Sequence, residues 1–287
     1  MSRYLRDFFK INSQQEKEIS KEDLKDLERA IGFLENPSFT MKLANYVGQP
    51  IEKGLKKIDP KVLTNASQKA LTKSLDIAIS SLNKKEKLSS SNLKHKILTT
   101  TSGGFGGFFG LASLAIELPI STTIMLRSIA DIAESEGHDL NKMDTRLACL
   151  EVFSLGSSKT TSDDGDASAY FASRGALSLE MKLAVDAVAN MSTKSIEHAL
   201  AQGQLPLMVK FINSIASRFS VTVSEKLVAQ SVPLLGAIGG ASLNLMFMNH
   251  FQKMAEGHFI VKRLENEYGQ KKIEEAYNSL NNKKTKG

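Results

Sequence analysis

The sequence contains no tryptophan, a single cysteine and six prolines, and few of its segments alternate between polar and apolar residues. One thiol cannot form an internal disulfide, which excludes a disulfide-stabilised scaffold. The lack of alternation argues against β-sheets, whereas Leu, Ala, Lys, Glu and Met are abundant and favour helices. We therefore expect an all-α fold in a single multi-helix domain, with Cys149 as a buried and inert thiol.

Signatures of catalysis, metal binding and phosphate binding are also missing. There is no HExxH or CxxC pair, no GxSxG elbow and no GxxxxGK[ST] loop. Residues 91–94 match the SxxK pattern without its companion motifs, and the acidic stretch 163–166 lacks the ligand spacing of an EF-hand. We expect no metal and no cofactor, and Glu117 is the only acid that we nominate as a catalytic candidate.

The N-terminal sequence and the charge distribution indicate the location of the protein and the class of its binding partners. The N-terminus has no apolar stretch of signal-peptide length, which favours a cytoplasmic location. The net charge is +6, and residues 101–200 are net acidic while both flanking regions are basic. Because the basic residues are not interleaved with aromatic ones as in a nucleic-acid module, we expect no nucleic-acid partner. An anionic surface would attract the basic regions.

The most informative segment is the apolar run at residues 97–126, which has one acid and no lysine or arginine. Its glycines recur four residues apart, which leaves strips of bare backbone on a helix where another helix or a lipid chain can approach. A second uncharged run at 227–249 repeats this spacing. We expect two glycine-rich apolar helices, within 104–136 and 227–267, packed against each other at the centre of the domain.

Eleven residues are assigned to this helix packing or to an apolar ligand: Gly103, Gly106, Gly107, Gly110, Glu117, Pro119, Arg127, Gly236, Gly239, Gly240 and Asn244. Glu117 precedes Pro119 at an expected helix junction. It could be a buried acid with a raised pKa. We favour a structural role instead, either as the partner of Arg127 or another core arginine or as an acid at a helix start near Pro119, where the helix dipole stabilises it.

A basic connector stands directly before the first apolar run. Its lysines are Lys84, Lys85, Lys87, Lys94 and Lys96. Lysines in such a position can lie against anionic phospholipid, each contributing about 1 kcal/mol. A solvated loop is the simpler alternative.

Hydrophobic periodicity and capping signals predict the remaining helices. A surface helix begins at Ser20 and ends before Pro37, and the other expected ranges are 39–58, 61–82, 119–136, 139–156, 167–172, 175–191, 193–202 and 206–230. Residues 157–165 are expected to form a polar loop. We divide the chain into an N-terminal extension with an amphipathic helix (1–38), a helical domain (39–270) and a basic tail (271–287).

The order of these segments resembles the EcsC protein family. The resemblance is carried by residues 43–52, by the glycine-rich run into the sequence AIELP at 115–119, by residues 126–139, and by the block 232–244 with the helix that follows it to residue 269. It covers about residues 40–270. The resemblance implies a bacterial protein linked to the cell envelope, because the family's namesake is encoded beside the subunits of an ABC transporter. Some members carry a peptidase or hydrolase label, and the family supplies no catalytic residue to transfer.

These observations favour a non-enzymatic protein attached peripherally to the inner face of the cytoplasmic membrane. Its partner would be an anionic membrane surface, a component of a membrane transporter, or an apolar ligand. Two alternatives stay open. One is a hydrolase or peptidase-like enzyme with Glu117 as its acid. The other is an integral membrane hairpin, which needs about 20 apolar residues for each span and would place Glu117 at a costly position.

Overall fold

The computed structural model describes residues 17–35, 59–81, 110–156, 168–230 and 240–286. Within these ranges 86% of the residues lie in 9 helices and none in a strand, which confirms the predicted all-α, single-domain fold. The α-helices are α2 (Lys21–Leu34), α5 (Pro60–Ser81), α7 (Gly110–Ser135), α8 (Met143–Glu151), α9 (Ala169–Val188), α10 (Thr193–Ala201), α11 (Pro206–Gln230), α13 (Gly240–Tyr268) and α14 (Gln270–Lys286), with a 3-10 turn, η1 (Val152–Ser154), after α8.

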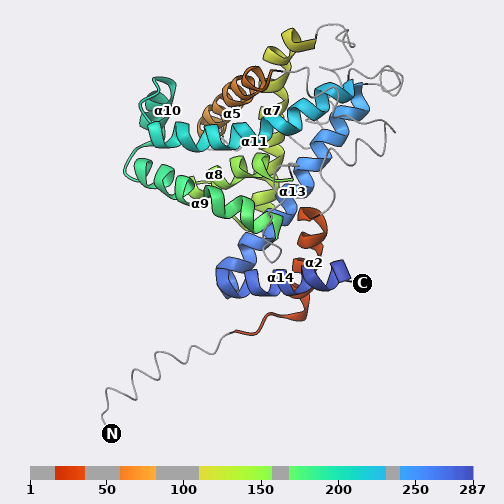
Figure 1. Cartoon of the computed structure of the whole chain (residues 1–287). Coiled ribbons are helices and arrows are strands. Elements are labelled where there is room, and N and C mark those ends of the chain that lie inside the picture. The colour runs from red at the N-terminus through yellow and green to blue at the C-terminus, as the bar shows by residue number, and fades with distance from the viewer. Residues whose placement is uncertain (1–16, 36–58, 82–109, 157–167, 231–239, 287) are drawn as a thin grey trace.

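Two long helices, α7 and α13, form the centre of the molecule (Figure 1). On one side, α5 packs on both α7 and α11, while α9 packs on α11 and α8. On the other side, α2 and α14 cover the C-terminal half of α13. The helices α2 and α14, which belong to the predicted flanking segments, thus contact the same central helix.

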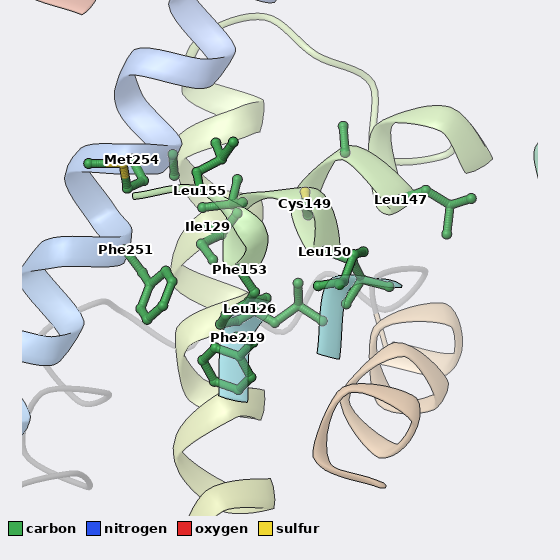
Figure 2. Close-up of a cluster of buried hydrophobic side chains, with 14 of the residues drawn as sticks. Leu126, Ile129, Leu147, Cys149, Leu150, Phe153, Leu155, Phe219, Phe251 and Met254 are labelled. Carbon is green, nitrogen blue, oxygen red and sulfur yellow. The ribbon is translucent and has the colours of Figure 1, made fainter. Parts of the chain in front are cut away.

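The core gathers around the 3-10 turn η1. Phe153 is fully buried and lies 5.0 Å from Phe219 of α11 and 5.1 Å from Phe251 of α13, measured between ring centroids. Figure 2 shows these rings beside Leu126 and Ile129 of α7. Because three helices and η1 meet on one aromatic cluster, this region fixes their mutual positions.

The expected helix junction at Pro119 is wrong. Helix α7 continues through Pro119, although proline has no N–H for the preceding turn. The hydroxyls of Ser121 and Thr123 donate to the carbonyls of Leu118 and Pro119, at 3.2 and 2.8 Å. The sequence pattern favoured a break because proline usually sits in a first helical turn, but burial of one continuous apolar face outweighs the lost bond.

Other boundaries follow the predictions with local differences. Ser20 accepts from the N–H of Asp23 at 3.0 Å and begins α2 as expected, and Gly137 ends α7 with φ of 83°. The two helices predicted at 167–172 and 175–191 form one helix, α9, that passes through Gly175. The range predicted as one central helix from residue 227 contains the end of α11 and the start of α13. The predicted helix 39–58 and the polar loop 157–165 lie outside the described residues.

Gly257 sets the distance between α13 and α2. A Cβ at this position would lie 2.7 Å from Leu34 Cγ and 3.0 Å from the carbonyl oxygen of Ala30. We expect Gly257→Ala to lower the free energy of unfolding by about 1–3 kcal/mol, because the backbone of α2 must shift. Thermal unfolding followed by circular dichroism measures the effect.

Gly175 provides the matched control. It lies in α9, is exposed, and a Cβ at this position would have no other atom within 4 Å. Gly175→Ala should therefore stabilise the protein by about 0.5–1 kcal/mol through the lower conformational entropy of alanine. Equal effects of the two substitutions would contradict the close approach of α2 and α13.

Candidate functional site

Helices α7 and α13 run in the same direction. Two hydrogen bonds join them in the same order along both helices: Gln252 to Ser128 at 2.7 Å, and Arg263 to Glu136, just after α7, at 3.1 Å. The helices therefore begin at the same end of the molecule (Figure 1). The first run, 97–126, contains the start of α7 at Gly110, and the second, 227–249, contains the start of α13 at Gly240. We call the first turns of α7 and α13, with the last turns of α11, the glycine end.

The predicted site residues divide into two groups. Gly103, Gly106, Gly107, Gly236 and Gly239 and the lysines Lys84, Lys85, Lys87, Lys94 and Lys96 lie outside the described residues. The packing of glycine on glycine thus stays a prediction. The described members are Gly110, Glu117, Pro119 and Arg127 on α7 and Gly240 and Asn244 on α13.

Glu117 forms an ion pair with Lys226 of α11. The Lys226 Nζ donates to Glu117 Oε1 at 3.0 Å and lies 4.9 Å from the centroid of the Phe247 ring. The expected partner Arg127 follows ten residues later on the same helix, which separates the two Cα atoms by about 15 Å. Glu117 is thus part of an ion pair, but the expected arginine partner is wrong, because the cation is a lysine from another helix.

Two large apolar side chains are exposed near the glycine end. Ile120 of α7 is 40% exposed and Leu245 of α13 is 44% exposed. The two contacts that align α7 with α13 place these residues at the same level along the paired helices. The glycine end therefore combines exposed apolar side chains with a partly exposed carboxylate.

A second group of ionisable residues lies buried at the centre of the fold. The ring nitrogen Nδ1 of His258 is 3.0 Å from the Tyr170 hydroxyl, and Nε2 is 3.6 Å from Glu151 Oε2. All three side chains are at most 3% exposed. Burial lowers the pKa of His258 well below its usual value of 6.5, and the nearby cations Arg174 and Lys262 act in the same direction. Burial also raises the pKa of Glu151, against the opposing charge of Arg174.

The contact between Glu151 and His258 is therefore not an ion pair near neutral pH. A charged pair would require a protonated imidazole, and the lowered pKa of His258 keeps that ring neutral. Within the described residues no group of three or more His, Cys, Asp and Glu side chains is placed to hold a metal ion.

Three further contacts tie α13 and the terminal segments to this buried group. Arg174 binds Glu265 with two hydrogen bonds of 2.7 and 2.9 Å. The Tyr277 hydroxyl of α14 donates to Glu35 Oε1 at 2.9 Å, and the rings of Tyr277 and Tyr170 stack at 5.7 Å. Burial raises the pKa of Tyr277 as well. The buried group thus connects the end of α2 with α9, α13 and α14.

The sequence patterns do not reveal this group. They indicate only a structural role for His258, and they place Glu151 in a predicted helix without a role. The available signal is Glu151 itself, because it is a charged residue among Leu147, Leu150 and Phe153 on the apolar side of that helix. Its partner His258 lies 107 positions later in the sequence, from 151 to 258. Helical periodicity relates only residues that are a few positions apart, so it does not identify this partner.

The buried side chains of His258 and Glu151 should make stability depend on pH in opposite directions. An unfolded chain protonates its histidine as the pH falls through 6.5, whereas folded His258 stays neutral, so this group lowers stability on acidification. An unfolded glutamate ionises as the pH rises through 4.5, whereas folded Glu151 keeps its proton to higher pH, so this group lowers stability on alkalinisation.

The variants His258→Gln and Glu151→Gln separate the two contributions. Relative to wild type, we expect the free energy of unfolding of His258→Gln to fall less between pH 7 and pH 5. That of Glu151→Gln should fall more over the same interval. Urea unfolding at several pH values measures both slopes. Parallel profiles for wild type and both variants would contradict the assigned pKa directions.

Cys149 is buried, as expected, and burial raises the pKa of its thiol to about 12. It is therefore a protonated thiol at neutral pH, consistent with the predicted inert role.

Comparison with known proteins identifies the family. The model of the EcsC protein family matches residues 8–264, a range that includes α2 and ends within α13. No curated protein and no solved structure shows a significant match. None of the helices in the described ranges has the length and apolar character required to cross a membrane. From the extent of the family match, the chain belongs to the EcsC protein family.

Proposed function

We propose that this EcsC-family protein is a non-catalytic protein that attaches to an anionic membrane surface through its glycine end, at the inner face of the cytoplasmic membrane. The observation that supports this most is the common direction of α7 and α13. It places the starts of α7 and α13, which lie within the two apolar runs of the sequence, at one end of the molecule, and Ile120 and Leu245 are exposed near it.

The charge distribution supports the same orientation. The lysines at 84–96 directly precede the first apolar run in the sequence. Basic residues beside an apolar segment combine attraction to anionic lipid with burial of apolar side chains. The hydrolase alternative depended on Glu117, and the described contact of that carboxylate is with Lys226 rather than with a histidine or serine.

Flotation with liposomes tests this proposal. We expect the protein to float with phosphatidylglycerol vesicles at low salt, to float less at high salt, and to stay at the bottom with phosphatidylcholine vesicles. Replacing Lys84, Lys85, Lys87, Lys94 and Lys96 with glutamine should reduce flotation with anionic vesicles at least several-fold.

A matched control carries the same change in charge elsewhere. The exposed lysines Lys21, Lys25, Lys182, Lys194 and Lys253 lie on α2, α9, α10 and the middle of α13. Their replacement with glutamine should leave flotation close to wild type. A wild-type protein that does not float with anionic vesicles at low salt would refute the proposed function, and equal losses in both sets would refute the role of the connector.

A further inference from the structure

The ion pair at the glycine end is unequal in exposure. The Lys226 side chain is 6% exposed, whereas that of Glu117 is 31% exposed. A buried ammonium group requires an anion beside it, because the cost of removing it from water is otherwise uncompensated. The Glu117 carboxylate supplies this anion and reaches the surface. It can therefore turn toward water at a lower cost in free energy than Lys226 can.

A buried amide lies one helical turn from the ring that this lysine contacts. Asn244 of α13 is 7% exposed, and its Oδ1 is buried without a hydrogen-bond partner among the residues that the structure describes. Residues three apart share one face of a helix, so Asn244 lies next to Phe247, whose ring Lys226 covers at 4.9 Å. An unsatisfied buried polar atom in a folded protein calls for a missing partner. By turning over, the amide offers either its oxygen to a hydroxyl or its NH2 to an anion.

The surroundings of this polar pair are apolar. Ile120 is three residues after Glu117 on α7, so it shares a helix face with that carboxylate, and it is 40% exposed. A group that replaces Glu117 at Lys226 would thus leave its remainder next to an exposed apolar side chain. That combination fits a molecule with an anionic head and an apolar tail.

We propose that Lys226 and Asn244 bind the phosphate group of an anionic headgroup, and that Glu117 occupies Lys226 as an internal counterion while that ligand is absent. Lysine is a common phosphate ligand and acts as a point charge. The ligand displaces the more exposed carboxylate, and the amide gains the partner that it lacks. This inference rests on the proposed function, since it names the ligand that the membrane-facing end would recognise.

The test compares opposite changes at the two ends of the ion pair. Binding of dihexanoyl-phosphatidylglycerol below its micelle concentration is measured by isothermal titration calorimetry with the full-length protein. We expect Glu117→Gln to tighten binding at least three-fold, because Lys226 no longer has a competing carboxylate. Lys226→Met keeps most of the apolar stem and should abolish measurable binding. A loss of folding cannot mimic the gain expected for Glu117→Gln.

The pair Lys210–Glu180 provides matched controls, because it also joins α11 to another helix, at 3.5 Å. Glu180→Gln and Lys210→Met should bind as wild type does. The double variant Glu117→Gln, Lys226→Met removes both charges together and should not bind. Circular dichroism confirms that each variant is folded.

Glycerol 1-phosphate distinguishes the two sources of the phosphate group. Binding of this soluble compound with the same dependence on Glu117 and Lys226 would identify phosphate itself as the ligand, whereas binding of the lipid alone would identify the phospholipid. Unchanged or weaker lipid binding by Glu117→Gln would overturn the inference. If wild type and all these variants float equally with anionic vesicles and bind the short-chain lipid equally, the inference fails while the proposed function stands.

Discussion

Replacing Arg174 with methionine is expected to lower the free energy of unfolding by about 3–5 kcal/mol. The Arg174 and Glu265 side chains are 14% and 9% exposed and share two hydrogen bonds. The variant would leave the Glu265 carboxylate in the interior without its cation. The guanidinium also lies 5.3 Å from the Tyr170 ring, so its loss loosens the start of α9 as well.

Two further variants isolate the charge effect. Arg174→Met combined with Glu265→Leu removes both charges and should recover most of the lost stability, since an apolar pair can replace a buried ion pair. Arg29→Met removes a surface arginine that is 3.8 Å from Glu256, and should change stability by less than about 1 kcal/mol. Urea unfolding supplies all three values. A cost for Arg174→Met as small as that for Arg29→Met would show that the buried pair contributes little.

Truncation of Phe153 to alanine should cost about 3–5 kcal/mol. The ring is fully buried where η1 meets α11 and α13, and it contacts Phe219 and Phe251 edge-on or tilted (Figure 2). Its removal leaves a cavity that the surrounding helices cannot fill without moving apart. Because this cluster joins helices on both sides of the core, we expect thermal unfolding to begin at a lower temperature for the whole molecule.

The size of the effect can be checked against two milder changes. Phe153→Leu keeps most of the apolar volume and should cost less than about 1.5 kcal/mol. Leu179→Ala alters a residue of α9 that is 66% exposed and should change stability by no more than about 0.5 kcal/mol. If Phe153→Ala were no more damaging than Leu179→Ala, the aromatic cluster would not be the centre of the core.

The sequence predicted that Glu117 needs a partner but did not identify Lys226 as that partner. The sequence showed an acid inside an apolar run, and an acid in such a place needs a partner. The partner itself is 109 positions away, on a helix that reaches α7 only through the packing of the fold. The same holds for Tyr170 and His258, which are 88 positions apart.

Two residues predicted to interrupt helices show that local propensity can be overridden by tertiary packing. Pro119 and Gly175 are residues that commonly interrupt helices, and both lie inside helices here. Local propensity amounts to about 1–3 kcal/mol at such positions, and tertiary packing of a long apolar face can exceed it. Signals that involve only neighbouring residues, such as the Ser20 cap and the glycine stop at Gly137, were predicted correctly from the sequence.

The sequence by itself determined the all-α class and most helix positions, because helical periodicity and capping act over three or four residues. It also indicated the family, through the order of its glycine-rich motifs. Only the tertiary structure decided that α7 and α13 run in the same direction, that Lys226 neutralises Glu117, and that Tyr170, His258 and Glu151 meet in the core. These arrangements depend on how whole helices bury their apolar faces against one another, a choice that no short segment contains.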